Sequence, residues 1–294
     1  NMYNTAVGSS AGAAVTTGTN NTLIGGLAGD ATTTGGDNVA VGHTALGVNT
    51  TGASNVALGA FALDANTTAS NNTAVGTSSL GSNTTGAGNT GIGRVALVAN
   101  TTGADNVALG YRALNANTTA NNNTAVGKDA GLSVTTGAQN TLIGGLAGDA
   151  ITTGDNNVAL GYEALTANTV GDRSTALGNY ALKSQNPSSN ADMYNVAIGH
   201  NAGGDVTTGI QNTFIGALSG DALTTGQDNV AMGKSALSAE TSGARSVAIG
   251  SNSLTAQNVG SGAAVYNTAV GYDAGYSVTT GINNTLIGGL AGDA

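Results

Sequence analysis

The chain lacks most of the residues from which an ordinary globular core is built. Among its 294 residues there is no Cys, no Trp and one Pro, and aromatic residues make up 3%. Because large side chains bury the most apolar area per residue, their scarcity predicts a thin core of Ala, Val, Ile and Leu in repeated layers. The absence of Cys excludes disulfides and leaves the compartment open.

Charge is also scarce. Charged residues make up 8% of the chain, and its net charge is −9. The seven Lys and Arg are scattered along the sequence without a basic stripe, which predicts that nucleic acid is not a partner. No signal peptide and no run of about 18 apolar residues is visible, so we expect no membrane insertion within this segment; targeting signals could lie outside it.

Glycine is abundant, with 48 residues, and one Gly recurs at a fixed period. Most intervals between its copies are 17 residues, and two are 21. The repeat glycines are Gly8, Gly25, Gly42, Gly59, Gly76, Gly93, Gly110, Gly127, Gly144, Gly161, Gly178, Gly199, Gly216, Gly233, Gly250, Gly271 and Gly288. The copies indicate seventeen repeats of one structural unit.

The residues around the repeat Gly predict a short strand. The residue before it is always Val, Ile, Leu or Met, and four residues before it lies Asn, replaced twice by Ser174 and Ser246. Small and branched residues alternate in this segment, which is typical of a strand. Helix is disfavoured, because each Gly costs about 1 kcal/mol relative to Ala.

One unit is too small to bury its own apolar face, so the copies must stack. The sequence therefore predicts an all-β fold, a parallel β-solenoid of 17-residue coils. At about 4.8 Å per coil, seventeen coils would form a rod of about 80 Å.

We expect residues 1–294 to form a single repeat domain. It begins with Asn and ends within a repeat, which indicates a fragment of a longer chain. Four-residue insertions fall near 186–194 and 258–266, and we expect them to project as surface loops. The candidate surface-loop residues are Pro187, Met193, Tyr194, Val265 and Tyr266.

A size exchange links neighbouring coils. Four residues after the repeat Gly the chain carries Leu in most copies and a second Gly in others. After several of these second glycines, the next copy replaces its usual strand Ala with a larger residue. Since close packing penalises both voids and excess volume, we expect the larger residue to fill the vacated space. These residues are Leu23, Leu142, Phe214 and Leu286.

No catalytic, cofactor-binding or metal site is predicted, and we expect no enzymatic activity. His43 and His200 follow the repeat Gly at a variable position, which favours a surface role. Other variable positions there show no evident binding cluster; they include Tyr111, Arg112, Tyr162, Glu163 and Tyr272. The glycine-rich segment 25–29 lacks the Lys-Ser/Thr of a phosphate-binding loop.

Four aspartates directly follow a second Gly of the kind described above: Asp30, Asp149, Asp221 and Asp293. Calcium needs several oxygen ligands that converge. A surface turn is the favoured interpretation, and a threefold axis that brings copies together is the alternative. Ion binding at these residues stays open.

The strand motif resembles a known group of fibrous proteins. Residues 195–199, Asn-Val-Ala-Ile-Gly, resemble the head repeat of YadA-type trimeric autotransporter adhesins, although the unit here is longer. With its Ala-Leu and Asn-Thr-Thr-Gly segments, the unit is also similar to repeats in phage-type tail-fibre proteins associated with an S74-type chaperone. The resemblance covers the whole chain.

The resemblance implies a left-handed parallel β-roll and a homotrimeric fibre, extracellular on a cell or virion surface. The implied partners are the chain itself and a host-surface protein or glycan. Strand geometry also favours association, because alternate residues point to opposite faces. One face would line the coil and the other would meet another subunit, with a monomeric two-layer solenoid as the alternative.

Three functions remain open from the sequence. The first is an adhesive fibre that holds an attachment tip away from a surface, and the second is a purely structural spacer. The third is an ice-binding solenoid, suggested by the recurring Thr-Thr pair. Since adjacent strand residues point to opposite sides, only one Thr of each pair would face outward, which disfavours ice binding.

Overall fold

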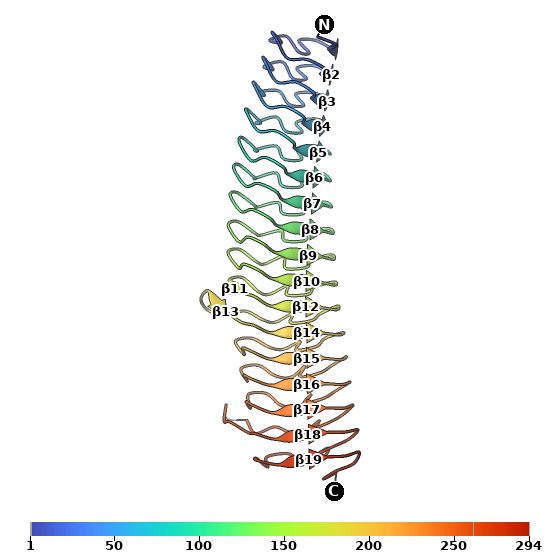
Figure 1. Cartoon of the computed structure of the whole chain (residues 1–294), viewed down its shortest axis with the longest axis vertical. Helices are drawn as coiled ribbons and strands as arrows, with labels where there is room; N and C mark the ends of the chain where they lie inside the picture. The colour runs from blue at the N-terminus through green and yellow to red at the C-terminus, as the bar shows by residue number, and fades with distance from the viewer. Residues whose placement is uncertain (1, 261, 294) are drawn as a thin grey trace. The chain divides into compact units, whose positions relative to one another are not determined.

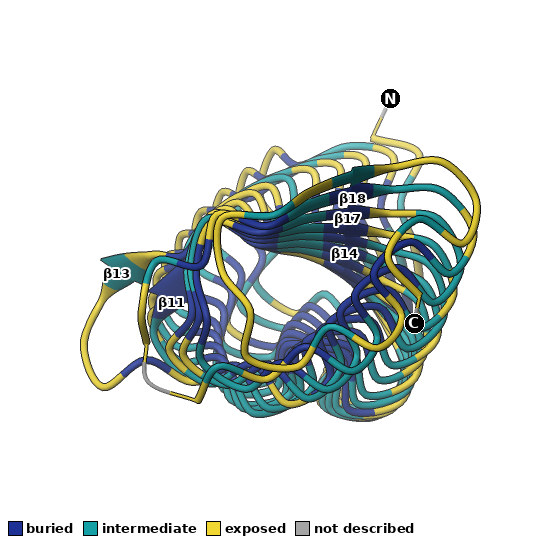
Figure 2. Ribbon diagram, turned by 90° about the horizontal axis from the view of Figure 1, so that it is seen from below, coloured by how far each residue is buried: buried dark blue, intermediate teal, exposed yellow. Residues whose placement is uncertain are grey.

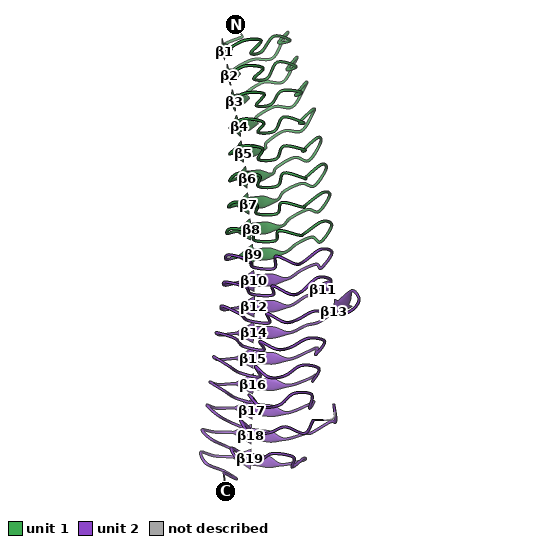
Figure 3. Ribbon diagram, turned by 180° about the vertical axis from the view of Figure 1, so that it is seen from behind, with its two compact units in different colours: residues 1–143 green, residues 144–294 purple. Residues whose placement is uncertain are grey.

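The computed structural model describes residues 2–260 and 262–293, and none of these is helical. The chain forms two compact units, Asn1–Ile143 and Gly144–Ala294, coloured green and purple in Figure 3. Each unit is a stack of coils that contribute one short strand each to a parallel sheet. The predicted all-β parallel solenoid of 17-residue coils is therefore confirmed.

Unit 1 contains nine strands, each pairing in parallel with the next along the chain (Figure 1). The register places Ala40 of one strand opposite Ala57 of the next, one repeat away. The strands are β1 Thr5–Val7, β2 Thr22–Ile24, β3 Val39–Val41, β4 Val56–Leu58, β5 Thr73–Val75, β6 Thr90–Ile92, β7 Val107–Leu109, β8 Thr124–Val126 and β9 Thr141–Ile143.

Unit 2 continues the same pattern and adds one small sheet. Its main strands are β10 Val158–Leu160, β12 Thr175–Leu177, β14 Val196–Ile198, β15 Thr213–Ile215, β16 Val230–Met232, β17 Val247–Ile249, β18 Thr268–Val270 and β19 Thr285–Ile287. The two-residue strands β11, Gly171–Asp172, and β13, Ala191–Asp192, pair beside the main stack (Figure 1). The longer coil that contains β13 is the first insertion.

The central residue is buried in every three-residue strand except β1 and β19. Ala57 is fully buried, whereas Val56 is half-buried and Leu58 is exposed. In unit 2 the buried centres of β14, β17 and β18 are visible in Figure 2. Because side chains alternate along a strand, the middle residue enters the coil and its two neighbours face outward.

The repeat Gly closes the strand with a backbone that only glycine adopts easily. Gly42 has φ +140°, and a Cβ there would lie 2.6 Å from the carbonyl carbon of Gly59 in the next coil. Close stacking of coils therefore excludes a side chain at this position. Four residues later Leu46 is left-handed, with φ +57°, and fully buried. We infer that its burial offsets a backbone cost of about 1–2 kcal/mol.

The Asn at the strand entrance forms a buried ladder. The backbone N–H of Asn55 donates to Oδ1 of Asn38 at 3.0 Å. The amide of Asn38 also crosses its coil and donates to the Gly52 carbonyl at 2.9 Å. The side chain therefore links each coil to the next and its two walls to each other. Each such bond contributes about 1 kcal/mol.

A second buried ladder runs along the opposite wall of unit 1. The side-chain amide of Asn66 donates to Oδ1 of Asn49 at 2.9 Å, and that of Asn83 donates to Asn66 at 3.1 Å. These residues are fully buried. Because unpaired buried amides are costly, the two ladders hold the coils in register.

The size-exchange residues lie where the second glycines leave space. Leu23 is fully buried, and a Cβ on Gly12 or Gly29 would lie 2.8 or 2.7 Å from its methyl carbons. In unit 2 a Cβ on Gly203 would lie 2.7 Å from the ring of Phe214, which is fully buried. Leu142 is also fully buried, and Leu286 is half-buried.

Candidate functional site

The most extensive candidate surface is the outer face of the sheet. The last residue of every main strand is aliphatic and faces outward, and we call this row the aliphatic stripe. In unit 1 it consists of Val7, Ile24, Val41, Leu58, Val75, Ile92, Leu109, Val126 and Ile143. In unit 2 it consists of Leu160, Leu177, Ile198, Ile215, Met232, Ile249, Val270 and Ile287.

Members of the stripe remain substantially exposed. Leu58 is 46% exposed and Leu109 is 45% exposed, whereas the Ala before each of them is fully buried. Beside the stripe runs the outward-facing first residue of each strand, which is Thr or Val. Contiguous apolar surface of this kind marks an interaction site on soluble proteins.

The Thr-Thr pairs divide into an inner and an outer row. The hydroxyl of Thr50 donates to the carbonyl of Thr67 at 3.0 Å, and the same bond recurs in neighbouring coils. Thr51, which follows Thr50, is exposed. One Thr of the pair therefore stabilises stacking and the other faces solvent in single file.

The loops after the repeat Gly carry aromatic and charged clusters that were not expected from the sequence. The rings of Tyr162 and Tyr180 meet edge-to-face with centroids 5.7 Å apart, and Tyr180 meets His200 at 5.8 Å. In unit 1 His43 meets Phe61 at 5.4 Å. These clusters could have been predicted from the spacing of the aromatic residues and His, because residues 17 to 20 apart lie in consecutive coils and are neighbours. Both His are exposed.

A third cluster in these loops contains Arg94, Tyr111 and Arg112, since both guanidinium groups lie over the tyrosine ring. No binding cluster was evident at Tyr111 and Arg112 from the sequence, and the structure brings both side chains together with Arg94. The basic residues are scattered along the sequence, but three of them, Arg94, Arg112 and Lys128, lie on loops of consecutive coils.

The first insertion only partly matches its predicted surface role. Tyr194 is exposed, but Pro187 is buried and Met193 is fully buried. Met193 follows β13 directly, and its backbone N–H donates to the carbonyl of Asp172 in β11 at 3.1 Å. The insertion is therefore anchored by its own apolar residues, which corrects the placement of Pro187 and Met193 on the surface.

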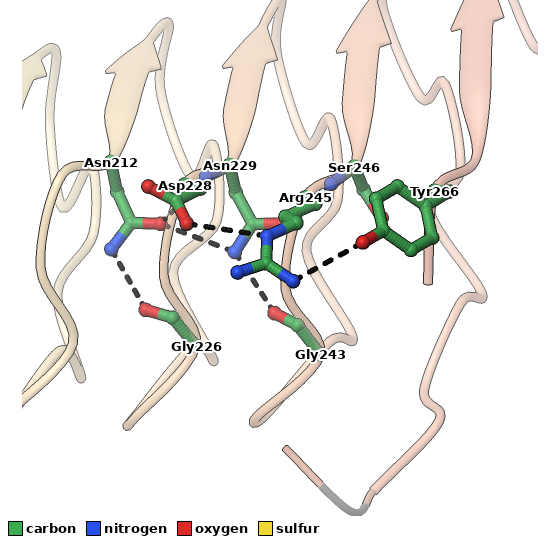
Figure 4. Close-up of polar contacts among 8 residues, drawn as sticks. All are labelled: Asn212, Gly226, Asp228, Asn229, Gly243, Arg245, Ser246 and Tyr266. Atoms are coloured by element: carbon green, nitrogen blue, oxygen red, sulfur yellow. Dashed lines mark hydrogen bonds and ion pairs between the residues drawn. The ribbon is translucent and has the colours of Figure 1, made fainter. Parts of the chain in front are cut away.

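The second insertion repeats this arrangement. Val265 is fully buried, which corrects its predicted surface position, and Tyr266 is exposed. Figure 4 shows Arg245 between two partners: its Nε lies 3.5 Å from Oδ2 of Asp228, and its Nη1 donates to the Tyr266 hydroxyl at 3.3 Å. In the first insertion Arg173 likewise lies over the ring of Tyr194.

Each insertion is preceded by a polar size exchange. Ser174 and Ser246 replace the ladder Asn, and the facing positions carry the longer Gln185 and Gln257. The amide of Gln185 donates to the Ser174 hydroxyl at 3.0 Å, and Gln257 does the same to Ser246. The longer Gln side chain therefore reaches the Ser hydroxyl and restores a hydrogen bond that the shorter Ser cannot form across the coil. Both substitutions can be seen in the sequence, but the sequence analysis did not recognise that Ser at one position occurs together with Gln at the other.

Glu240 is a buried carboxylate within the second ladder position of unit 2. Its Oε1 accepts the backbone N–H groups of Thr241, Ser242 and Gly243 at 2.7 to 3.1 Å. Its Oε2 accepts from Gln257 at 3.0 Å. These bonds satisfy the carboxylate internally.

The four aspartates considered for calcium lie in separate coils. The hydroxyl of Thr166 donates to Asp149, and burial raises the pKa of Asp221. Within residues 2–260 and 262–293, no group of three or more His, Cys, Asp or Glu is arranged to hold a metal ion. The same residues enclose no pocket and include no helix that could cross a bilayer.

Compared with known proteins, the chain matches no family model, no curated protein and no solved structure.

Proposed function

We propose that the chain is a structural and adhesive fibre segment on an extracellular, cell or virion surface. In this proposal three copies associate through their aliphatic stripes, and the assembled solenoid holds an attachment region away from the surface. The role is non-enzymatic. The observation that carries the proposal is the aliphatic stripe.

The stripe supports association because its aliphatic side chains contribute little to the stability of an isolated chain. The interior accepts mainly Ala at the strand centre, while Val, Ile, Leu or Met occupies the outward position in every coil. Burying each of these side chains against a partner would contribute about 1 kcal/mol or more. An isolated chain would not gain this stabilisation in either unit.

Three copies suit the shape of the face. A strand of three residues offers two outward side chains per coil, so the face is narrow. Three narrow faces can close around one axis and bury both rows, and the resemblance to trimeric adhesin heads implies the same number.

The ladders support a mechanical role. Every described coil is joined to a neighbour by backbone pairing, and most are also joined by buried side-chain amides. Such stacking gives stiffness without large side chains. A purely structural spacer would share these features, and the aromatic and charged loops favour the adhesive version. The single file of exposed Thr does not favour ice binding.

The proposal is tested by the mass of the full chain in solution, measured by sedimentation equilibrium. We expect three chain masses for the natural sequence and one for the double variant Leu58→Lys, Leu109→Lys, with an unchanged β-type circular dichroism spectrum. The control is Val48→Lys, because Val48 is 46% exposed but lies outside the stripe. A natural chain that sediments as a monomer would overturn the proposed association.

A further inference from the structure

The basic residues of unit 1 are concentrated at one place. Unit 1 contains five acidic residues and three basic ones, a net charge of 3 − 5 = −2. The three basic residues are Arg94, Arg112 and Lys128, and all lie on the loops that follow β6, β7 and β8. These strands are consecutive, so the loops are stacked neighbours.

Tyr111 organises this cluster. Its ring centroid lies 5.7 Å from Cζ of Arg94 and 5.1 Å from Cζ of Arg112. A guanidinium at this distance from an aromatic ring is held by cation–π attraction. Tyr111 is exposed, so the cluster lies on the surface.

One of the three cations is neutralised. Arg112 binds Asp129 through both carboxylate oxygens, at 2.7 Å from Nε and 2.9 Å from Nη2. This hydrogen bond is the main cause that raises the pKa of Arg112. The side chain of Asp129 is 4% exposed, so its charge is covered by the arginine.

The other two cations are exposed. Among the described residues, the Arg94 guanidinium makes no hydrogen bond or ion pair, and its side chain is exposed. Lys128 has a side chain 71% exposed, and its Nζ lies 3.8 Å from Asp129. The cluster therefore has a net charge of 3 − 1 = +2 on a chain whose net charge is −9.

We propose that the patch of Arg94, Tyr111 and Lys128 binds an acidic glycan chain through its carboxylate or sulfate groups. The inference deepens the adhesive role proposed above by naming a ligand class. Arg94 and Lys128 occupy the same repeat position two coils apart, a separation of about 10 Å. An extended sugar chain advances by a similar distance per residue as the solenoid does per coil. Acidic groups on alternate sugars therefore match the two cations.

The size of the patch argues for a glycan rather than a nucleic acid. Affinity for nucleic acid comes from neutralising many closely spaced phosphates. The patch offers two exposed cations, and Tyr111 is already engaged by arginines instead of being open for base stacking.

The test is calorimetric titration of the full chain with a hyaluronan octasaccharide and a heparin-derived octasaccharide at low salt. We expect binding of at least one of them, weakened by salt, and none of a neutral chitin hexasaccharide. Arg94→Gln should weaken binding about tenfold, in line with loss of one charge-assisted contact.

The matched control is Lys234→Gln, which removes a cation at the same repeat position after β16 in unit 2. We expect it to change affinity by less than about twofold, because it lies outside the patch. Equal weakening by both variants, no binding of either acidic probe, or tighter binding of single-stranded DNA of the same charge would overturn the inference. Arg94→Gln should leave the mass in solution unchanged, so a failure of glycan binding is distinguishable from a failure of association.

Discussion

The inner and outer faces of the same strand differ in the size of their side chains: the buried inner face carries small residues and the exposed outer face carries large ones. In β4 the inward residue is Ala57, fully buried, and the outward residue is Leu58, 46% exposed. The inner face can be explained within one coil stack, because its small residue leaves space for the buried Leu of the opposite wall. The outer face carries the larger side chain where a single chain gains little from it. The small inner residues therefore account for the coil itself, and the larger outer residues are explained by the association proposed above.

We expect the largest loss of stability from a substitution in the turn that follows the strand. Two adjacent glycines in that turn, Gly25 and Gly26, differ in how much a side chain would disturb them. Gly25 has φ +134°, and a Cβ there would lie 2.7 Å from the carbonyl carbon of Gly42. Gly26 lacks positive φ, and its Cβ would meet only His43, at 3.7 Å.

We expect Gly25→Ala to destabilise the chain by about 4 kcal/mol, because coil stacking and backbone are both strained. Gly26→Ala should stay within about 0.5 kcal/mol or stabilise slightly. Urea denaturation followed by circular dichroism measures both. Equal effects of the two substitutions would refute the account of the turn.

A smaller effect should follow from emptying the inner face. Leu23→Ala removes the side chain that fills the space over Gly12 and Gly29, and should cost about 3 kcal/mol. Gly29 has φ +55°, close to the +57° of Leu46 at the same repeat position.

Adding Gly29→Leu to Leu23→Ala should therefore restore part of the loss, since it recreates the ordinary coil. Gly29→Leu alone should destabilise, because its side chain would meet Leu23. A double-mutant cycle with no coupling energy would show that the two positions do not share a space.

The sequence predicted the repeat and the exchange of apolar side chains between coils, but it did not predict the contacts among variable surface residues. The 17-residue period and the alternation around Ala57 and Leu58 were sufficient to predict parallel coils. Positions one coil apart, such as Arg94 and Tyr111, are isolated variable residues in the sequence, and only the stack makes them neighbours. The clusters that carry the glycan inference were therefore not predicted.

The surface assignment of the insertions was wrong for a different reason. Extra residues in a repeat usually indicate a loop, and Met193 and Val265 were assigned to the surface on that ground. Both are apolar and occupy equivalent positions, and the structure buries both. The recurrence of an apolar residue before an exposed Tyr was the available signal.

The most direct test of the proposed assembly uses the absence of cysteine. Leu58 in the stripe and Val48 outside it are both 46% exposed, so Leu58→Cys and Val48→Cys introduce single thiols that are equally accessible in one chain. Maleimide labelling rates of the two native variants are compared, with labelling in denaturant as the reference.

The account predicts that the thiol at position 58 reacts at least about tenfold more slowly than that at position 48 in the native assembly, because a partner covers the stripe. Both thiols should react equally in denaturant. Equal native rates would show that the stripe stays open to solvent and would contradict the proposed association.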